Sequence, residues 1–231
     1  MTLKGKLLPN SDPKSLFFED DSELDYRDAK VKDFVVKPTT IQCVREFVEK
    51  WHYSGTVNGL RISHVFGLYY NDDLIGAMIY GPLGMANVWK KYGESENDVV
   101  ELRRLCCIDR TPKNTESYFI GQTIRWLKKN SEYKVIISYA DTFHNHSGVI
   151  YKASNFKHEG MTSPGRVIEL DGRTFHDKAI RAYYTNASGE KSLKPFAQRL
   201  RDALESGAAQ YVVTPGKHIY IYPLDKGKRN D

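Results

Sequence analysis

The sequence predicts an α/β protein with one mixed β-sheet, and three patterns support this. Residues 63–70 and 74–80 are strand-like runs joined by an Asn-Asp-Asp turn, which is typical of an antiparallel hairpin. Residues 98–109 and 135–139 are also strand-like, and a helical pattern over residues 115–129 lies between them. Because strands joined through a helix usually pair in parallel by a right-handed crossover, the sheet is expected to contain both orientations.

The first helix is expected over residues 39–52, where apolar side chains recur on one helical face. Thr39 and Gln42 have the spacing of a capping box, and the sequence Tyr53-Ser54-Gly55 ends the helix. His52 therefore lies at the helix C-terminus, where the helix dipole favours an imidazolium ion.

The strand over residues 98–109 carries two adjacent arginines, Arg103 and Arg104. In a regular strand neighbouring side chains alternate between the two faces, so the two arginines are expected on opposite faces. One of them then faces a ligand, a carboxylate or solvent. Glu101 and Asp109 are the carboxylates expected to pair with Arg103.

The leading site candidate is the junction between the strand 135–139 and the helix that follows it. This strand is short, apolar and rich in β-branched residues, and Asp141 comes shortly after its end. The pattern then changes to a helical period that carries Tyr151. Because open α/β sheets bind ligands at the carboxyl ends of strands, Asp141 and Tyr151 are expected in a functional site.

Residues 1–35 are expected to form an irregular N-terminal arm, and residues 36–231 a single domain with a C-terminal extension from about residue 160. The arm contains an acidic block over residues 19–28, which predicts a solvated segment. The patterns in the extension predict a strand over 166–170, a helix over 194–205 ended by Gly207, and a last strand over 218–222 that closes the sheet.

The chain is mildly basic, with a net charge of +5 and a pI near 8.9, which favours a nucleic-acid partner. Three cysteines without C-x-x-C spacing suggest neither a disulfide framework nor a zinc site. No apolar run approaches the roughly 20 residues of a membrane helix, and the N-terminus lacks a secretory leader. The basic residues that are candidates for contacts with nucleic-acid phosphates are Lys90, Lys91, Arg110, Lys113, Lys226, Lys228 and Arg229.

The order of elements, with His144, Tyr151 and Asn155-Phe156, resembles the GCN5-related N-acetyltransferase (GNAT) superfamily over about residues 39–156. The resemblance implies a GNAT-like catalytic domain: a mostly antiparallel sheet with one splayed parallel strand pair, flanked by helices. An acyl donor would lie in the gap between the splayed strands. The sequence TPKNTESYFIGQ stands where that superfamily has a glycine-rich pyrophosphate loop, so the chain departs from the pattern there.

A second resemblance is to the Mom family of phage proteins. It rests on the segments Trp51-His52-Tyr53-Ser54-Gly55, Glu101 to Leu105, Asn114 to Gln122 and Ser138 to Asp141. The resemblance implies an enzyme in the host cytoplasm that converts adenine in double-stranded DNA to N6-carbamoylmethyl adenine and so protects phage DNA from restriction. It places six residues in the active site, namely His52, Tyr53, Arg103, Ser117, Asp141 and Tyr151.

Under this hypothesis His52 or Asp141 is the general base, because the N6 lone pair of adenine is delocalised into the ring. Tyr151 is the acid or orienting group, and Arg103 holds a phosphate or carbonyl oxygen. Tyr53, Ser117, Tyr139 and Phe143 are expected to bind the substrate, with aromatic rings around a flipped adenine. Each of these residues also has a purely structural interpretation, as a cap, an ion-pair partner or a core aromatic.

The donor stays open between acetyl-CoA and an activated glycine such as glycyl-tRNA, in which case tRNA is a second partner. A route by oxidation of a methyl group would need a redox metal such as iron. Asp141, His144 and His146 carry carboxylate and imidazole groups that suit iron or zinc, so a metal site at these residues is a further hypothesis. Two other functions stay open as well. One is a GNAT acyltransferase acting on a protein or a small amine, and the other is a DNA-binding module without catalysis.

Overall fold

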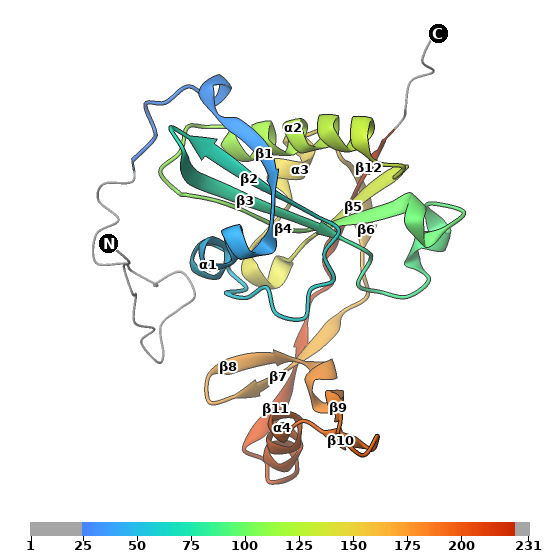
Figure 1. Ribbon diagram of the computed structural model, residues 1–231. Coiled ribbons are helices and arrows are strands. Elements are labelled where there is room, and N and C mark those ends of the chain that lie inside the picture. Colours follow the sequence, from blue (N-terminus) through green and yellow to red (C-terminus); the bar gives the residue numbers. More distant parts are fainter. Residues whose placement is uncertain (1–24, 225–231) are drawn as a thin grey trace. The chain divides into compact units, whose positions relative to one another are not determined.

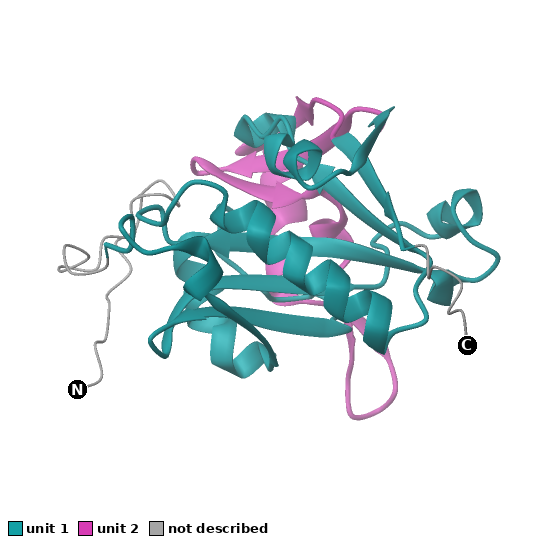
Figure 2. Ribbon diagram, turned by 90° about the horizontal axis from the view of Figure 1, so that it is seen from above, with its two compact units in different colours: residues 1–160, 218–231 teal, residues 161–217 magenta. Residues whose placement is uncertain are grey.

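The computed structural model describes residues 25–224, which divide into two compact units (Figures 1 and 2). Within the described range, unit 1 comprises residues 25–160 and 218–224, and unit 2 comprises residues 161–217. Unit 2 is therefore an insertion between two segments of unit 1. No helix among residues 25–224 is long and apolar enough to cross a membrane.

Unit 1 contains a seven-stranded sheet in the order β1-β2-β3-β4-β5-β12-β6. The pairs β1–β2, β2–β3 and β3–β4 are antiparallel. The pair β4–β5 is parallel, and the pair β5–β12 is antiparallel. This confirms the predicted mixed, mostly antiparallel sheet with one parallel pair. Its strands are β1 (Val35–Thr39), β2 (His64–Tyr70), β3 (Asp73–Gly81), β4 (Val99–Cys107), β5 (Val135–Ala140), β6 (Lys157–Met161) and β12 (His218–Pro223).

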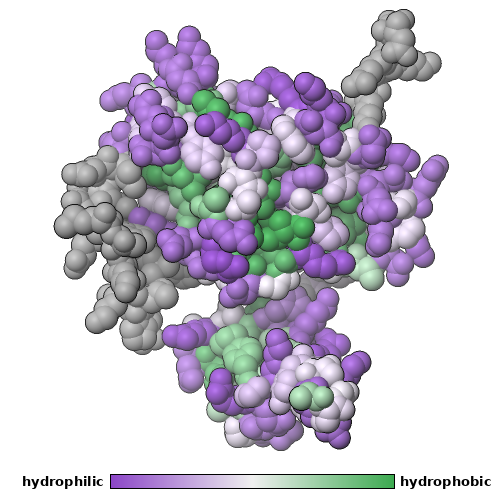
Figure 3. All heavy atoms as spheres, in the orientation of Figure 1, coloured by the Kyte–Doolittle hydropathy of each residue, from purple (hydrophilic) through white to green (hydrophobic). Residues whose placement is uncertain are grey.

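Helices cover both faces of this sheet, with α2 on one face and α1 on the other (Figure 1). Successive side chains of β3 point to opposite faces of the sheet. Met78 packs in the same apolar cluster as Phe119 of α2, whereas Ala77 and Ile79 pack in the cluster that contains Val44 of α1. In the surface view, apolar side chains show in patches among hydrophilic ones (Figure 3). The helices of unit 1 are α1 (Ile41–Trp51), α2 (Thr115–Asn130) and α3 (Val149–Ala153), with short 3-10 turns η2 (Val31–Asp33), η3 (Val88–Lys91), η4 (Glu96–Asp98) and η5 (Thr142–His144).

The parallel strands β4 and β5 separate part-way along their length. Their pairing runs from Val99 opposite Val135 to Leu102 opposite Ser138 and then stops, although both strands continue. The Ser138 hydroxyl donates a hydrogen bond to the Leu102 carbonyl oxygen over 3.2 Å at this point. The gap that opens beyond it leaves room for a ligand between the two strand ends.

A bulge in β4 corrects the prediction for its two arginines. Tyr80 pairs with Leu102 and the next residue back, Ile79, pairs with Arg104, so Arg103 is the additional residue. Leu102 and Leu105 both pack in the cluster on the α2 side. Arg103 and Arg104 between them therefore share the opposite side of the strand, and the expectation of opposite faces is wrong.

Three further expectations for unit 1 need correction. A strand, β1, immediately precedes the first helix, whose N-cap is Thr40 without a side-chain hydrogen bond, so the capping box of Thr39 and Gln42 does not form. The last strand, β12, lies between β5 and β6 and does not end the sheet. The end of the expected irregular arm is ordered, since the Tyr26 hydroxyl donates to Asp73 over 3.0 Å. The remainder of the arm and most of the acidic block, residues 1–24, lie outside the described residues.

Unit 2 has its own small core, formed by Ile168, Leu200 and Ala209 between a helix and a three-stranded sheet. The predicted strand and helix are present here as β7 and α4, but the other strands were not predicted. The two ends of the unit meet, because the Thr162 N–H donates to the Lys217 carbonyl oxygen over 2.9 Å. Its elements are β7 (Gly165–Leu170), β8 (Arg173–His176), η6 (Asp177–Arg181), β9 (Tyr183–Thr185), β10 (Lys191–Leu193), α4 (Pro195–Glu205) and β11 (Ala209–Thr214).

Candidate functional site

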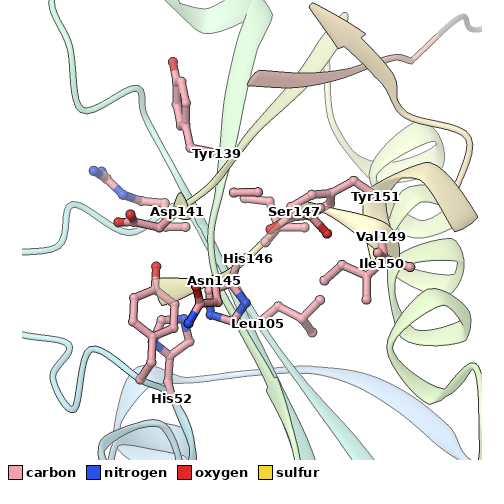
Figure 4. A pocket seen from close by; sticks show the side chains of 15 residues that line it. His52, Leu105, Tyr139, Asp141, Asn145, His146, Ser147, Val149, Ile150 and Tyr151 are labelled. Carbon is pink, nitrogen blue, oxygen red and sulfur yellow. The ribbon is translucent and has the colours of Figure 1, made fainter. Parts of the chain in front are cut away.

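A cavity of about 290 Å³ lies where β4 and β5 separate (Figure 4). The end of α1, the bulged part of β4, the end of β5 and the segment that leads into α3 all contribute to it. The lining residues are His52, Tyr53, Leu102, Arg103, Leu105, Tyr139, Ala140, Asp141, Asn145, His146, Ser147, Gly148, Val149, Ile150 and Tyr151. The junction predicted from the sequence is thus one wall of this cavity.

His52 enters the cavity from the C-terminal end of α1. Its side chain is buried, and its Nδ1 accepts a hydrogen bond from the Ser54 backbone N–H over 3.1 Å. A backbone N–H is always a donor, so Nδ1 carries no proton and the neutral ring holds its proton on Nε2. The Ser54 hydroxyl oxygen lies 2.9 Å from the same nitrogen. The local chain turn therefore fixes the tautomer of His52.

The charge state of His52 differs from the sequence-based expectation. Burial, followed by the nearby positive charge of Arg104, lowers the pKa of His52 from 6.5 to about 3. These effects outweigh the helix dipole, which is worth only about 0.3–1 kcal/mol at ordinary exposure. The expected imidazolium is therefore wrong, and His52 is a neutral Nε2–H donor near pH 7.

Tyr53 lies within a group of three histidine rings. Its ring centroid is 4.3 Å from that of His52, 4.5 Å from that of His144 and 4.9 Å from that of His146. Burial, and then the Asp141 carboxylate, raise the pKa of Tyr53, so its hydroxyl stays protonated. Because neighbouring rings already contact Tyr53, a stacked base would have to displace His144 or His146.

Asp141 is buried at the end of β5, where it also starts the turn η5. Its Oδ1 accepts a hydrogen bond from the Phe143 N–H over 3.1 Å, which orients the carboxylate. Its carbonyl oxygen accepts from the N–H groups of both His144 and His146 over 3.1 Å. The following segment is therefore wound tightly around Asp141 and carries His146 into the cavity wall.

Tyr151 lies on the opposite wall, near Ile150 and Val149 (Figure 4). Its ring packs against Phe156 and Tyr220, with centroid distances of 5.5 and 5.3 Å. Burial raises the pKa of Tyr151 to about 12 against the smaller opposing effect of a hydrogen bond with Ser138. Its hydroxyl is therefore a proton donor, or a hydrogen-bond donor, at neutral pH.

Arg103 lines the cavity, with its guanidinium held beneath the loop 82–84. Its Nη1 donates to the Pro82 carbonyl oxygen over 3.0 Å, and its Nε lies 3.8 Å from Oε1 of Glu101. Glu101, the first of the two expected carboxylates, is thus its partner. The Nε atoms of Arg103 and Arg104 are buried without a hydrogen-bond partner among the described residues. A buried guanidinium with an unused donor is suited to an acceptor oxygen of a ligand.

Three of the residues predicted to bind the substrate are not placed as expected. Ser117 does not line the cavity, and its hydroxyl donates to the Asn114 carbonyl oxygen over 3.0 Å at the start of α2. Phe143 is 40 % exposed and also does not line the cavity. Tyr139 lines it, but its ring points away from Asp141 (Figure 4) and packs with the cluster that contains Leu83.

The metal hypothesis receives no support from the arrangement of side chains. Within residues 25–224, no group of three or more His, Cys, Asp or Glu residues is placed to hold a metal ion. His144 and His146 instead contact the ring of Tyr53.

In the segment from Asn145 to Gly148, only His146 was selected from the sequence, as a candidate metal ligand. Asn145 and Gly148 both have positive φ, of 59° and 75°. A Cβ on Gly148 would lie 2.2 Å from Cε2 of Tyr220, whose hydroxyl donates to the Ser147 carbonyl oxygen over 2.7 Å. The Asn-x-x-Gly spacing after a strand end is the signal that could have indicated this tight turn.

Comparison with known proteins identifies the family of this chain. The model of the Mom protein family matches residues 33–231. The chain belongs to the Mom family. It is similar to the protein named methylcarbamoylase mom of Escherichia phage Mu, with 31% identity over 150 residues. The match covers 62% of this chain and 61% of the phage Mu protein, which is less than two thirds of that protein's length.

Solved structures with a similar fold include GNAT acetyltransferases. A GNAT family acetyltransferase from Elizabethkingia anophelis with acetyl-CoA bound has a TM-score of 0.42 at 10% identity, covering 83% of this chain and 98% of that one. NAA60 of Arabidopsis thaliana in complex with acetyl-CoA has a TM-score of 0.47 at 12% identity, covering 82% and 98%. Structural similarity at these TM-scores and identities gives no information about the activity of this chain.

The six positions taken from the Mom resemblance can be compared with the cavity. Five of them line it: His52, Tyr53, Arg103, Asp141 and Tyr151. Arg103 belongs to β4 and Tyr151 to α3, whereas His52 and Tyr53 follow the end of α1 and Asp141 follows the end of β5. Ser117 is the sixth position and does not line the cavity.

Proposed function

We propose that this Mom-family chain is a transferase that modifies adenine in double-stranded DNA to N6-carbamoylmethyl adenine. In a phage, this modification would protect the DNA from host restriction. The observation that carries the proposal is the convergence of five positions taken from the Mom resemblance on one cavity at the separated strands. Buried acid-base groups in a cavity favour an enzyme over a DNA-binding module without catalysis.

The size of the cavity suits a single nucleobase and a small acyl group. Its volume of about 290 Å³ lies at the lower end of the range for small-molecule sites, about 300–1,000 Å³. An enzyme that reacts with N6 of a paired adenine has to take the base out of the duplex. The apolar side chains of Leu102, Leu105 and Ile150 would face the flipped base, and Asp141 and Tyr151 would face its reacting edge.

The side chains suggest a division of roles that begins with the base. Asp141 is a carboxylate oriented by the Phe143 N–H, and it would accept the proton that N6 loses on attack. His52 is a poor base because its pKa is lowered to about 3 and its Nδ1 is already hydrogen-bonded. Its Nε2–H would instead donate to the oxygen that gains charge when the acyl group is attacked. These observations favour Asp141 over His52 as the general base.

Tyr151 and Arg103 would complete the site. The Tyr151 hydroxyl stays protonated because its pKa is raised to about 12, so it can give a proton to the leaving group. The Arg103 guanidinium, whose Nε lies 3.8 Å from Oε1 of Glu101, lines the cavity and would bind a second acceptor oxygen, either of the acyl group or of a phosphate.

The product restricts the donor. Acetyl transfer from acetyl-CoA would leave N6–CO–CH3, whereas the proposed product joins N6 to a methylene group that carries a primary amide. An activated glycine reaches that product in two steps. N6 first displaces the carrier from the glycyl ester; the glycyl amine then attacks C6 through a five-membered spiro intermediate. The original N6 leaves C6 and becomes the amide nitrogen. The atoms balance without an oxidant, whereas an acetyl donor would need oxidation of its methyl group.

Nucleoside mass spectrometry of plasmid DNA from cells that express the chain tests the function. We expect N6-carbamoylmethyl deoxyadenosine in the digest and none from cells with an empty vector. Unmodified adenine together with acylated protein or small amines would support the acyltransferase alternative instead.

Glycine labelled with ¹⁵N tests the donor in the same cells. The glycyl route places the label on the nitrogen attached to C6 and leaves the original exocyclic nitrogen in the terminal amide. A product whose C6-bound nitrogen carries no glycine label would exclude this route and favour acetyl-CoA.

A further inference from the structure

Unit 2 carries positive charge that the cavity chemistry does not use. Residues 178–201 contain six Lys and Arg residues and a single acidic residue, Glu190. The formal charge of this stretch is therefore +5, which equals that of the whole 231-residue chain. The rest of the chain is neutral on balance. The six basic residues are Lys178, Arg181, Lys191, Lys194, Arg199 and Arg201.

Little of this charge is neutralised locally. Arg181 pairs with Asp177 over 3.6 Å, and none of the other five basic residues forms an ion pair with a carboxylate within residues 25–224. The single acid, Glu190, accepts a hydrogen bond from Asn186 over 3.1 Å across its own turn. Concentrated, unpaired cations raise the local potential and attract a polyanion.

The basic residues surround a small hairpin with exposed aromatic rings. The strands β9 and β10 pair Thr185 with Lys191 and Tyr183 with Leu193, so Tyr183 and Lys191 lie on the same face of the hairpin. Tyr183 is 49% exposed, and its neighbour Tyr184 is 45% exposed. Exposed tyrosine beside lysine offers hydroxyl and ammonium donors to the same anion.

The helix α4 adds an oriented guanidinium to this hairpin. The Nε of Arg201 donates to the Ile180 carbonyl oxygen over 2.9 Å, and its Nη2 lies 3.4 Å from the Tyr183 hydroxyl oxygen. The Lys194 N–H donates to the Ala182 carbonyl oxygen over 2.8 Å, which holds the start of α4 against the hairpin. The resulting basic hairpin surface consists of Arg181, Tyr183, Lys191, Lys194 and Arg201, whereas Tyr184 lies on the other face of the hairpin.

We propose that the basic hairpin surface binds the phosphate backbone of duplex DNA, an inference that rests on DNA being the substrate in the proposed function. Lysine, arginine and tyrosine are common donors to DNA phosphates, and such contacts position a protein without reading the sequence. The surface offers four positively charged side chains and the phenol hydroxyl of Tyr183. Unit 2 thereby holds the substrate, and unit 1 supplies the chemistry.

Salt-dependent binding to a short fluorescent duplex tests the inference by anisotropy. The variant is Arg181→Gln, Lys191→Gln and Lys194→Gln combined. The matched control is Lys32→Gln, Arg125→Gln and Lys129→Gln, which removes the same charge from exposed positions of unit 1. We expect the variant to bind more weakly and its slope of log affinity against log salt to fall by up to about 3, at about 0.9 per lost phosphate contact. The control should keep the wild-type slope.

Equal slopes and affinities for the variant and the control would overturn the inference. A stronger effect on the binding of tRNA or of anionic lipid vesicles than on duplex binding would also overturn it. If the triple variant has a lower melting temperature than the control, single Lys191→Gln and Lys194→Gln changes replace it, each with an expected slope change of about 1. Modified adenine is measured separately: wild type that binds DNA but leaves it unmodified contradicts the proposed function and not this inference.

Discussion

The Ser54 backbone N–H donates a hydrogen bond to Nδ1 of His52 over 3.1 Å, and this contact decides which ring nitrogen carries the proton. The ring therefore offers Nε2–H to the cavity and has no free basic nitrogen. A residue that looks like a general base in the sequence becomes a hydrogen-bond donor in the fold.

The donor role of His52 predicts different outcomes for two amide substitutions. His52→Gln can place an N–H near the position of Nε2, whereas the shorter side chain of His52→Asn reaches only the position of Nδ1. We expect His52→Asn to lose about 10²–10³-fold in kcat, as for removal of one preorganised donor, and His52→Gln to retain more activity. The pH profile of His52→Gln should parallel that of the wild type. Equal loss in both variants, with a changed pH profile, would indicate a base.

The same residue makes stability depend on pH. The pKa of His52 is about 3 in the folded chain and near 6.5 when unfolded, so between these values only the unfolded state is protonated. Stability should therefore fall as the pH decreases from about 6.5 towards 3. When the free energy of unfolding is measured in urea, it should fall less steeply with decreasing pH for His52→Gln than for the wild type. The difference in slope should correspond to at most one bound proton per molecule. An unchanged pH dependence would contradict the neutral, buried state of His52.

Gly148→Ala should destabilise the chain more than Gly59→Ala. Both glycines have a φ of 75°, so both substitutions carry the cost of a left-handed backbone, about 1–2 kcal/mol. Only at Gly148 would the new Cβ meet Tyr220, at 2.2 Å, whereas nothing lies within 4 Å at Gly59. We expect an additional loss of about 1–3 kcal/mol from overpacking, measured by urea unfolding. Equal losses of stability in the two variants would show that the segment at Gly148 can move away from Tyr220.

Ser117→Ala should leave modification within about twofold of wild type, the range expected for a surface substitution of about 0.5 kcal/mol. Its hydroxyl bonds to the Asn114 carbonyl oxygen at the start of α2 and does not line the cavity. The measurement is the fraction of modified adenine at equal protein concentration. A loss of a hundredfold would show that α2 approaches the substrate.

The periodicity of the sequence was sufficient to predict most of the central sheet and its helices, but not the strands β1 and β6. The hairpin of β2 and β3, the helix α2 and the junction after β5 depend on local patterns of apolar and turn residues. The bulge at Arg103 could not be predicted, because it depends on the register of pairing with β3. The strands of unit 2 are short and mostly exposed, so their alternation is weak.

The site was predicted in part for a similar reason. Asp141 follows a strand of strong pattern, and Tyr151 lies on the next helix, so both were accessible to pattern analysis. The protonation of His52 was not, because it depends on burial and on Arg104, which is distant in the sequence. Family resemblance also identified Ser117, whose side chain turns back to its own helix.

The central claim is that the cavity at the separated strands modifies adenine in DNA. Quantitative nucleoside mass spectrometry of DNA from cells expressing wild type, Asp141→Asn or Tyr151→Phe tests it most directly. Asp141→Asn keeps an oxygen for the Phe143 N–H, and Tyr151→Phe keeps the ring contacts with Phe156 and Tyr220, so both variants should fold. We predict N6-carbamoylmethyl deoxyadenosine from wild type and a decrease of about 10²–10⁴-fold in the rate of modification for each variant. Wild-type levels of the modified nucleoside from both folded variants, or none from wild type, would contradict the account.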